Sequence, residues 1–374
     1  MRAAALSLSA LLSAFLLAAG TTPAPYASRE ALGEALFHDP NLSAGRSQSC
    51  ASCHDPEIAF TDGREAVAGR AVSLGDDGHS IGERNAPSAA YAYLAPPFAR
   101  REDGSYHGGL FWDGRADGLA RQAAAPPLNP REMAMADEAA VAARLRENEG
   151  YRTAFGALYG PAVLDDPSSA FAAMTDAIAA FEATAPFGTF DSKYDRWLRG
   201  EYQMTRQEEL GRTLFFSSQF ANCQLCHRLA APMDRQEPFT NYEFHNIGVP
   251  ANPALDQPPD RGLGAVLGDP GQDGKFRVPG LRNVAVTGPY MHNGVFADLR
   301  TVIAFYNKYN SRAPARQIDP ETGRPWAAPE VAENIALDRL EQGPALDDRR
   351  IDALVAFLRT LTDRRYEPLL GQGE

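Results

Sequence analysis

Apolar side chains recur at helical spacing in two segments of the carboxyl-terminal half. With the preceding Leu299, the segment "TVIAFYNKYN" (301–310) places apolar residues at offsets 0, 3, 4 and 7, and Tyr306 is the last of them. The segment "IDALVAFLRTL" (351–361) has the same offsets, which are those of one buried helical face. Near the amino end, "SREALGEALF" predicts a helix capped by Ser28. No run of alternating residues predicts strands, so the expected fold is mainly α, with long Pro- and Gly-rich loops.

Four short motifs occur twice in the same order, which predicts an internal repeat. We expect two haem-domain-sized units, 28–185 and 191–374, with a boundary near 184–195. The pairs are LGEALF with LGRTLF, CASCH with CQLCH, ERNAP with LRNVA (83–87 with 281–285), and HGGLF with HNGVF (107–111 with 292–296).

The amino end has the pattern of a cleaved secretory signal. In residues 1–20, one Arg precedes an unbroken run of small and apolar residues, and Ala18 and Gly20 have the spacing that a signal peptidase accepts. An uncleaved membrane anchor is the alternative, although the run is short for a span of about 20 apolar residues. We therefore expect an exported, periplasmic protein with no membrane span after cleavage.

The charge of the chain excludes one class of partner. The 374 residues have a formal net charge of −12, and no Lys/Arg-rich block provides a local exception. A chain this acidic has no electrostatic attraction for nucleic acid. Its partners are expected to be small molecules or proteins.

All four cysteines lie in two CxxCH motifs, which are typical of c-type haem attachment. Cys50 and Cys53 precede His54, and Cys223 and Cys226 precede His227. In this chemistry the cysteines form thioethers to the porphyrin and the adjacent histidine binds the iron. Zinc would need further thiolates or histidines at suitable spacing, and a redox CxxC does not require the histidine. Two covalently bound haem c groups are predicted.

The chain resembles the bacterial di-haem cytochrome c peroxidase superfamily. The resemblance rests on both CxxCH motifs, the repeat, and the segments "FWDGRADGLARQAAAPPLNPREMA" and "LRNVAVTGPYMHNGVFADLRTV". Within this superfamily it is most similar to the MauG-type di-haem enzymes of methylamine utilisation. The resemblance implies a high-spin first haem on His54, open to peroxide, and a low-spin second haem on His227.

The resemblance also implies roles for further residues. Glu132 would be the distal acid–base group that moves a proton between the peroxide oxygens, and Trp112 would relay electrons between the haems. Gln122 and Pro126 would shape the distal pocket. In isolation Trp112 reads as a core residue and Glu132 as a surface one. Asn85, Thr287 and Pro289 would hold one Ca²⁺, an ion that takes amide and carbonyl oxygens.

The sixth ligand of the second haem separates the two main functional readings. Peroxidases of the superfamily use Met, whereas the MauG type uses Tyr. The seven methionines of the chain end at Met291, and Tyr306 lies where the peroxidases supply their Met. Met291 itself stays open as a ligand, since thioether and phenolate are both haem donors.

Three functions follow from these alternatives. The first is an enzyme that uses H₂O₂, or O₂ plus electrons, to complete tryptophan tryptophylquinone in a precursor of methylamine dehydrogenase. The second is a cytochrome c peroxidase supplied by a small electron-donor protein such as a cytochrome c or a cupredoxin. The third is a di-haem electron carrier without catalysis, against which Glu132 argues.

The other histidines are not expected to bind iron. His38 and His79 are predicted to be solvated, and His245 and His292 to form hydrogen bonds near the second haem.

Overall fold

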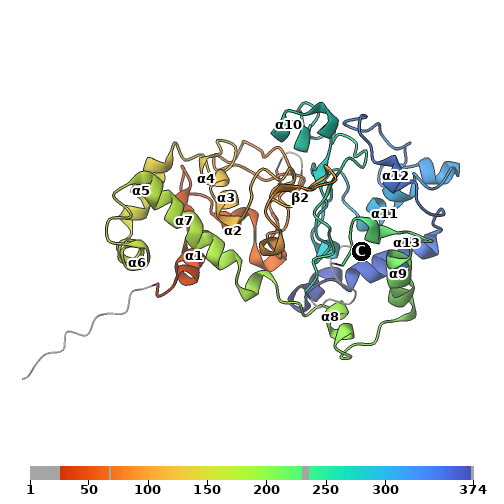
Figure 1. Cartoon of the computed structure of the whole chain (residues 1–374), viewed down its shortest axis with the longest axis horizontal. Helices are drawn as coiled ribbons and strands as arrows, with labels where there is room; N and C mark the ends of the chain where they lie inside the picture. Colours follow the sequence, from red (N-terminus) through yellow and green to blue (C-terminus); the bar gives the residue numbers. More distant parts are fainter. Residues whose placement is uncertain (1–25, 67–68, 230–235, 372–374) are drawn as a thin grey trace, which may run out of the picture.

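The computed structural model describes residues 26–66, 69–229 and 236–371 and is mostly helical (Figure 1). The predicted signal, residues 1–20, lies outside the described residues. The Ser28 cap is confirmed, because its hydroxyl accepts a hydrogen bond from the Ala31 N–H at 3.3 Å. In the part of the chain that is described, no helix is long and apolar enough to cross a membrane.

The helices fall into two groups along the chain, drawn at the left and the right of Figure 1. The first group is α1 (Arg29–Phe37), α2 (Cys50–Cys53), α3 (Leu119–Ala123), α4 (Ala125–Leu128), α5 (Glu138–Glu147), α6 (Glu149–Tyr159) and α7 (Pro167–Glu182). The second is α8 (Lys193–Leu198), α9 (Arg206–Phe216), α10 (Leu263–Leu267), α11 (Leu299–Asn307), α12 (Leu337–Leu340) and α13 (Asp348–Arg359).

Strands are few and short, as the sequence predicts. Two antiparallel pairs are present in the described chain, each strand two residues long. They are β1 (Ala99–Arg100) with β2 (Tyr106–His107), and β3 (Phe244–His245) with β4 (Phe276–Arg277). Long loops connect them and carry much of the functional site.

Each group is built on one helix pair that packs at a glycine. A Cβ added at Gly33 of α1 would lie 1.9 Å from the Ala177 carbonyl oxygen of α7. A Cβ added at Gly211 of α9 would lie 1.9 Å from the Ala353 oxygen of α13. Only glycine allows such close approach of two helix backbones. The LG of each LGxxLF motif is therefore a helix-packing signal.

The buried apolar residues form two clusters that separate along the chain. One contains residues between Leu32 and Phe187, and the other contains residues between Tyr194 and Leu361. The stretch 188–193 between them contributes to neither. Each cluster surrounds one of the two glycine-packed helix pairs.

The two helix groups contain turns with the same backbone geometry. The residues that these turns pair differ from the residues paired by two of the four sequence motifs. Tyr91 (φ 62°) and Asn283 (φ 61°) each precede a 3-10 turn, η3 (Ala92–Leu94) and η7 (Val284–Val286). Tyr91, and not Asn85, is therefore the counterpart of Asn283. The predicted pairing of ERNAP with LRNVA was wrong. It rested on identical residue types, whereas the turn is defined by a residue with a left-handed backbone conformation.

The same correction applies to the HxGxF match. Isolated bridges join Leu110 to Ala116 and Tyr290 to Phe296, and each closes a tight turn whose ends are six positions apart. Trp112 in the first turn therefore corresponds to His292 in the second. The sequence match had aligned 107–111 with 292–296, which is five positions out of this register.

Candidate di-haem and catalytic site

One cavity of about 780 Å³ runs through both groups of helices. All fourteen site residues predicted from the sequence line it, so chain segments more than 250 residues apart meet here. They are Cys50, Cys53, His54, Asn85, Trp112, Gln122, Pro126, Glu132, Cys223, Cys226, His227, Thr287, Pro289 and Tyr306.

The two CxxCH histidines are held in the same way. His54 Nδ1 lies 3.1 Å from the Phe60 carbonyl oxygen, and His227 Nδ1 lies 3.1 Å from the Phe239 oxygen. A ring nitrogen hydrogen-bonded to a carbonyl leaves Nε2 as the metal donor. Burial lowers the pKa of His54 and lowers the pKa of His227 to about 4, so both rings are neutral at pH 7, as ligands must be.

The cysteines are not paired in disulfides. Each pair lies in one short helical turn beside its histidine. Within the described residues, no group of three His, Cys, Asp or Glu side chains could hold a metal ion, so no zinc site competes there. The thiols, the oriented imidazoles and the cavity fit two covalently attached haems.

The predicted distal residues lie together next to the first motif. Glu132 lines the cavity, and its carbonyl oxygen accepts a hydrogen bond from Gln48 Nε2 at 3.1 Å. Burial raises the pKa of the Glu132 carboxyl, and nearby Arg115 opposes this rise. Gln122 and Pro126 come from the short helices α3 and α4 on the same wall. A carboxyl group that holds its proton more readily is suited to acid–base work on peroxide.

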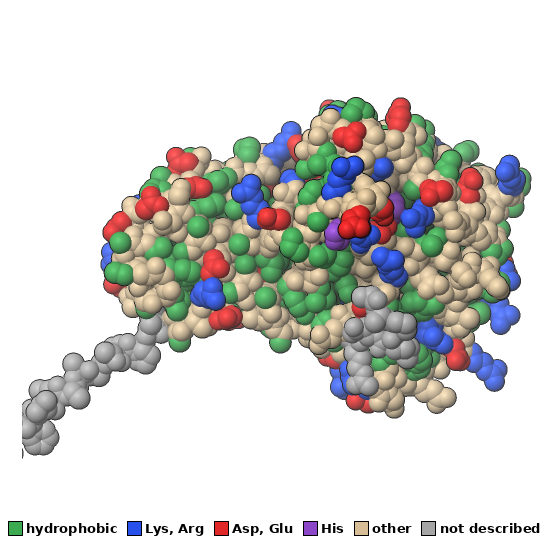
Figure 2. Space-filling model, viewed as in Figure 1, with side chains coloured by type: hydrophobic (Ala, Val, Ile, Leu, Met, Phe, Trp, Pro, Cys, Tyr) green, Lys and Arg blue, Asp and Glu red, His purple; other side chains and the backbone are tan. Residues whose placement is uncertain are grey.

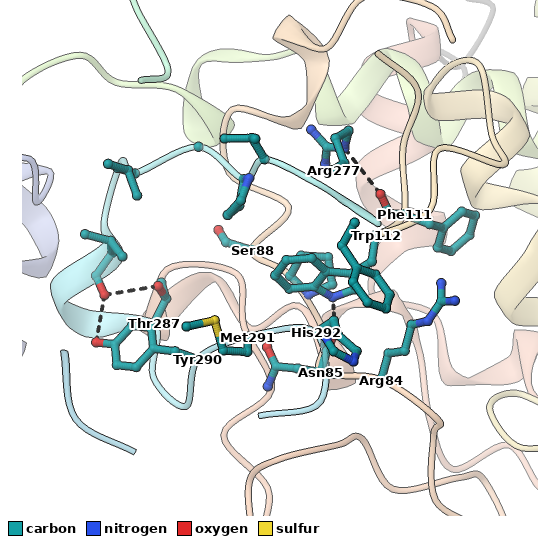
Figure 3. A pocket seen from close by; sticks show the side chains of 18 of the residues that line it. Arg84, Asn85, Ser88, Phe111, Trp112, Arg277, Thr287, Tyr290, Met291 and His292 are labelled. Atoms are coloured by element: carbon teal, nitrogen blue, oxygen red, sulfur yellow. Dashed lines mark hydrogen bonds between the residues drawn. The ribbon is translucent and has the colours of Figure 1, made fainter. Parts of the chain in front are cut away.

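Trp112 lies in the middle of the cavity wall shown in Figure 3. Its indole Nε1–H donates to the Asn85 carbonyl oxygen at 2.8 Å, and the Asn85 N–H donates to the His292 oxygen at 2.7 Å. Trp112 in the first group is thus joined to its counterpart in the second through one residue. This position suits an electron relay between two haems.

Tyr306 extends from helix α11 into the cavity beside the second motif. Burial raises the pKa of its phenol, with a further contribution from Cys226. Such a phenol deprotonates only where a cation compensates, as an iron ion does. Met291 also lines the cavity, next to Tyr290 in the turn before α11 (Figure 3). Both candidates for the sixth ligand therefore reach the site.

The three residues predicted to bind calcium line the same cavity, and they offer different oxygen atoms to an ion. Asn85 Nδ2 donates to the Ala71 oxygen at 3.1 Å, so its amide oxygen remains free to bind an ion. The Thr287 hydroxyl lies 3.4 Å from the Val284 oxygen. Oxygen donors of this type suit Ca²⁺.

Three of the other histidines lie as predicted. His38 and His79 are exposed, and neither lines the cavity. His292 is 3% exposed, and its Nε2 lies 2.9 Å from a Glu330 carboxylate oxygen. The predicted hydrogen bond of His245 is not formed at Nε2, which lies 3.4 Å from Glu243 and has no hydrogen-bond partner within the described residues.

Several charged residues of the site carry no signal in the sequence. Arg84 binds Asp113 and Asp260 at 2.6 Å each, which ties the two groups of helices together next to Trp112. Glu330 is 38 positions from its partner His292. These pairs form only on folding, and no local pattern marks them.

Comparison with known proteins places the chain among its relatives. Residues 27–203 match the family described as di-haem cytochrome c peroxidase. The methylamine utilization protein MauG of Paracoccus denitrificans is 58% identical over 352 residues, which are 91% of this chain and 90% of the relative. The chain belongs to the di-haem cytochrome c peroxidase family. Members of this family are haem oxidoreductases, and two haem c groups are the cofactors of this chain.

Two further relatives support the family assignment. Cytochrome c peroxidase Ccp of Escherichia coli is 32% identical over 300 residues, covering 78% of this chain and 56% of that protein. The diheme peroxidase BthA of Burkholderia thailandensis has the same fold, with a TM-score of 0.79, 34% identity, and coverage of 92% of this chain and 88% of that one. The mainly helical fold predicted from the sequence is confirmed.

Proposed function

We propose that this protein is a MauG-type enzyme. It uses H₂O₂, or O₂ plus electrons, to oxidise a precursor of the methylamine dehydrogenase small subunit and complete its tryptophan tryptophylquinone. The 58% identity to a methylamine utilization protein over 91% of the chain carries this proposal. The sequence has no methionine after Met291, and Tyr306 lines the cavity where the peroxidases of the superfamily supply a methionine ligand. This supports the proposal further.

Within this proposal the protein side chains have separate roles. The haems, when bound, supply iron that reacts with peroxide and exchanges single electrons. His54 and His227 would each hold one iron, and Tyr306 would be a second protein ligand of the iron that His227 holds. Glu132 moves the proton from the inner to the outer peroxide oxygen. Gln122 and Pro126 shape the distal pocket in which Glu132 acts.

A folded protein substrate cannot enter the cavity, so its electrons must cross this chain one residue at a time. Trp112 serves as a relay in this route because an indole is oxidisable and lies between the two motifs. Figure 2 presents a face on which acidic and basic side chains are interspersed, without an extended basic patch. Such a surface suits a protein partner better than nucleic acid.

The organisation of the chain is part of the proposal. Residues 28–185 and 191–374 are two haem domains that descend from one duplicated unit. The matched Gly33 and Gly211 contacts and the paired hydrogen bonds of His54 and His227 support it. Asn85, Thr287 and Pro289 hold one Ca²⁺ between them, and the protein acts in the periplasm after signal cleavage.

The proposal is tested by mixing the di-haem protein and H₂O₂ with precursor dehydrogenase. Quinone absorbance should develop, and it should require both peroxide and the protein. No quinone absorbance, together with rapid oxidation of reduced cytochrome c, would establish instead the cytochrome c peroxidase reading that the E. coli relative suggests. Two six-coordinate haems inert to peroxide would establish the electron-carrier reading.

A further inference from the structure

We propose that Tyr91 is a second oxidisable relay residue and that Asp363 is its proton acceptor. This inference rests on the proposed function, which supplies the peroxide-derived oxidant. Tyr91 lines the haem cavity and is 5% exposed. Its hydroxyl donates to Asp363 Oδ1 at 2.5 Å. The two residues are 272 positions apart, so the bond joins the two groups of helices.

Asp363 is placed to act as a base. Its second oxygen, Oδ2, accepts a hydrogen bond from Asn283 Nδ2 at 2.9 Å. Hydrogen bonds donated to both carboxyl oxygens favour the ionised form, which is the form that can accept a proton. Burial raises the pKa of Asp363 above its usual range, which makes it a stronger base than an exposed aspartate. Burial and the Asp363 charge also raise the pKa of Tyr91, so the phenol keeps its proton until it is oxidised.

The surroundings of the ring require the proton to leave with the electron. The Arg282 guanidinium lies 5.5 Å from the centre of the Tyr91 ring, and it is held there by Asp195 at 2.5 Å. A fixed cation disfavours positive charge on a nearby ring in a buried site. Loss of an electron alone would create such a charge, whereas loss of an electron and a proton leaves a neutral radical.

The hydrogen-bond partner distinguishes Tyr91 from Trp112. The Trp112 N–H donates to the Asn85 backbone oxygen, and an amide oxygen is too weak a base to take the proton. Trp112 therefore keeps its proton when it is oxidised, whereas Tyr91 transfers its own to Asp363. Relay through Tyr91 is consequently coupled to proton movement.

A short route joins Tyr91 to the first iron ligand. The Phe60 carbonyl oxygen accepts hydrogen bonds from His54 Nδ1 at 3.1 Å and from the Ala89 N–H at 3.2 Å. Tyr91 is two residues beyond Ala89, and the Phe190 N–H donates to its hydroxyl at 3.2 Å. Two hydrogen bonds and a short stretch of backbone thus connect Tyr91 to His54, and the Phe190 N–H holds the phenol in place.

The step balances without a further reagent. Tyr91 gives one electron to the peroxide-oxidised haem site, and its O–H bond breaks as the proton passes to Asp363 Oδ1. The products are a neutral tyrosyl radical and a neutral Asp363 carboxyl group. Reduction of the radical by one electron from the protein substrate returns the proton from Asp363 to the phenol.

The test is electron paramagnetic resonance of the di-haem protein frozen soon after H₂O₂ is added without protein substrate. We expect a tyrosyl signal that changes its hyperfine pattern when the protein contains ring-deuterated tyrosine. The signal should be lost in Tyr91→Phe, be reduced in Asp363→Asn, and form more slowly in D₂O. Tyr93→Phe is the matched control, since Tyr93 lies in the same 3-10 turn η3, and it should retain the full signal.

A merely structural role for the Tyr91–Asp363 bond would lower thermal stability in Tyr91→Phe and leave the tyrosyl signal intact. That result, or the absence of a tyrosyl signal in the native protein, would overturn the inference. The outcomes for the two proposals are separable. Quinone formation without a Tyr91-dependent radical refutes the relay alone. A Tyr91-dependent radical without quinone formation refutes the proposed substrate alone.

Discussion

The two helix groups have matching backbone turns but carry different side chains at them. The first group has Trp112 where the second has His292, and Tyr91 where the second has Asn283. Both residues of the first group can be oxidised by one electron at accessible potentials. Their counterparts are hydrogen-bonding side chains that resist oxidation. Under the proposed roles, both relay residues therefore belong to the group that carries His54.

A third matched position extends the comparison. The helix pairs superpose Ala177 on Ala353, which aligns Glu182 of α7 with Leu358 of α13. Both side chains line the cavity. Burial raises the pKa of Glu182 to about 8, and its Oε2 has no hydrogen-bond partner within the described chain. Where the second group has an apolar contact, the first keeps a protonated carboxyl group.

The largest effect is expected from removing the ligand that sets the second group apart. Tyr306→Phe should abolish the six-coordinate low-spin spectrum of the second haem and leave the first haem unchanged. Tyr309→Phe is the control on the same stretch of chain, because its hydroxyl donates to the Ile247 oxygen and it does not line the cavity. An unchanged low-spin spectrum in Tyr306→Phe would show that Tyr306 is not the ligand and would leave Met291 as the candidate.

Loss of the distal acid–base group should come next. Glu132→Gln keeps the shape of the side chain but cannot shuttle a proton, so quinone formation should slow by about 10²- to 10⁴-fold. The rate is measured by stopped-flow absorbance after H₂O₂ is added. Glu147→Gln is the control, since Glu147 is an exposed carboxylate that pairs with Arg46 at 2.8 Å and does not line the cavity. Equal rates in native protein and Glu132→Gln would remove Glu132 from the mechanism.

Glu182 should make the stability of the first group depend on pH. Its pKa is about 8 when folded and near 4.5 when unfolded. The native state therefore binds more protons between these values, and its stability falls as pH rises from about 4.5 to about 8. The expected loss is a few kcal/mol. Glu182→Leu, which copies Leu358, should flatten this slope in urea unfolding measured at pH 5 and pH 8. An identical slope in both proteins would contradict the assignment.

The glycine contacts should be equally sensitive in both groups. Gly33→Ala and Gly211→Ala each force two helix backbones apart and should cost about 1–3 kcal/mol of unfolding free energy. Gly118→Ala serves as the control, since a Cβ there meets nothing within 4 Å and its φ of −177° is extended backbone that any residue adopts. A cost at only one of the two packing glycines would show that the helix pairs are not equivalent.

Local chemistry could be predicted from the sequence alone. The CxxCH motifs place their cysteines and histidine within one turn of chain, so spacing suffices to predict haem attachment. The Ser28 cap and the helix that carries Tyr306 follow from interactions among residues three or four positions apart. The family resemblance then extended the prediction to residues such as Glu132 and Asn85, all of which reach the cavity.

Contacts between distant segments were decided only by the tertiary structure. Asn283 and His292 were paired with the wrong residues from sequence identity alone, because the matching turns are defined by backbone conformation and different side chains can adopt it. The bond from Tyr91 to Asp363 spans 272 positions, and no local pattern predicts which buried phenol will meet which carboxylate. Haem attachment is encoded within five consecutive residues, whereas the hydrogen bonds that link Trp112 to His292 through Asn85, and Tyr91 to Asp363, form only where the two halves pack together.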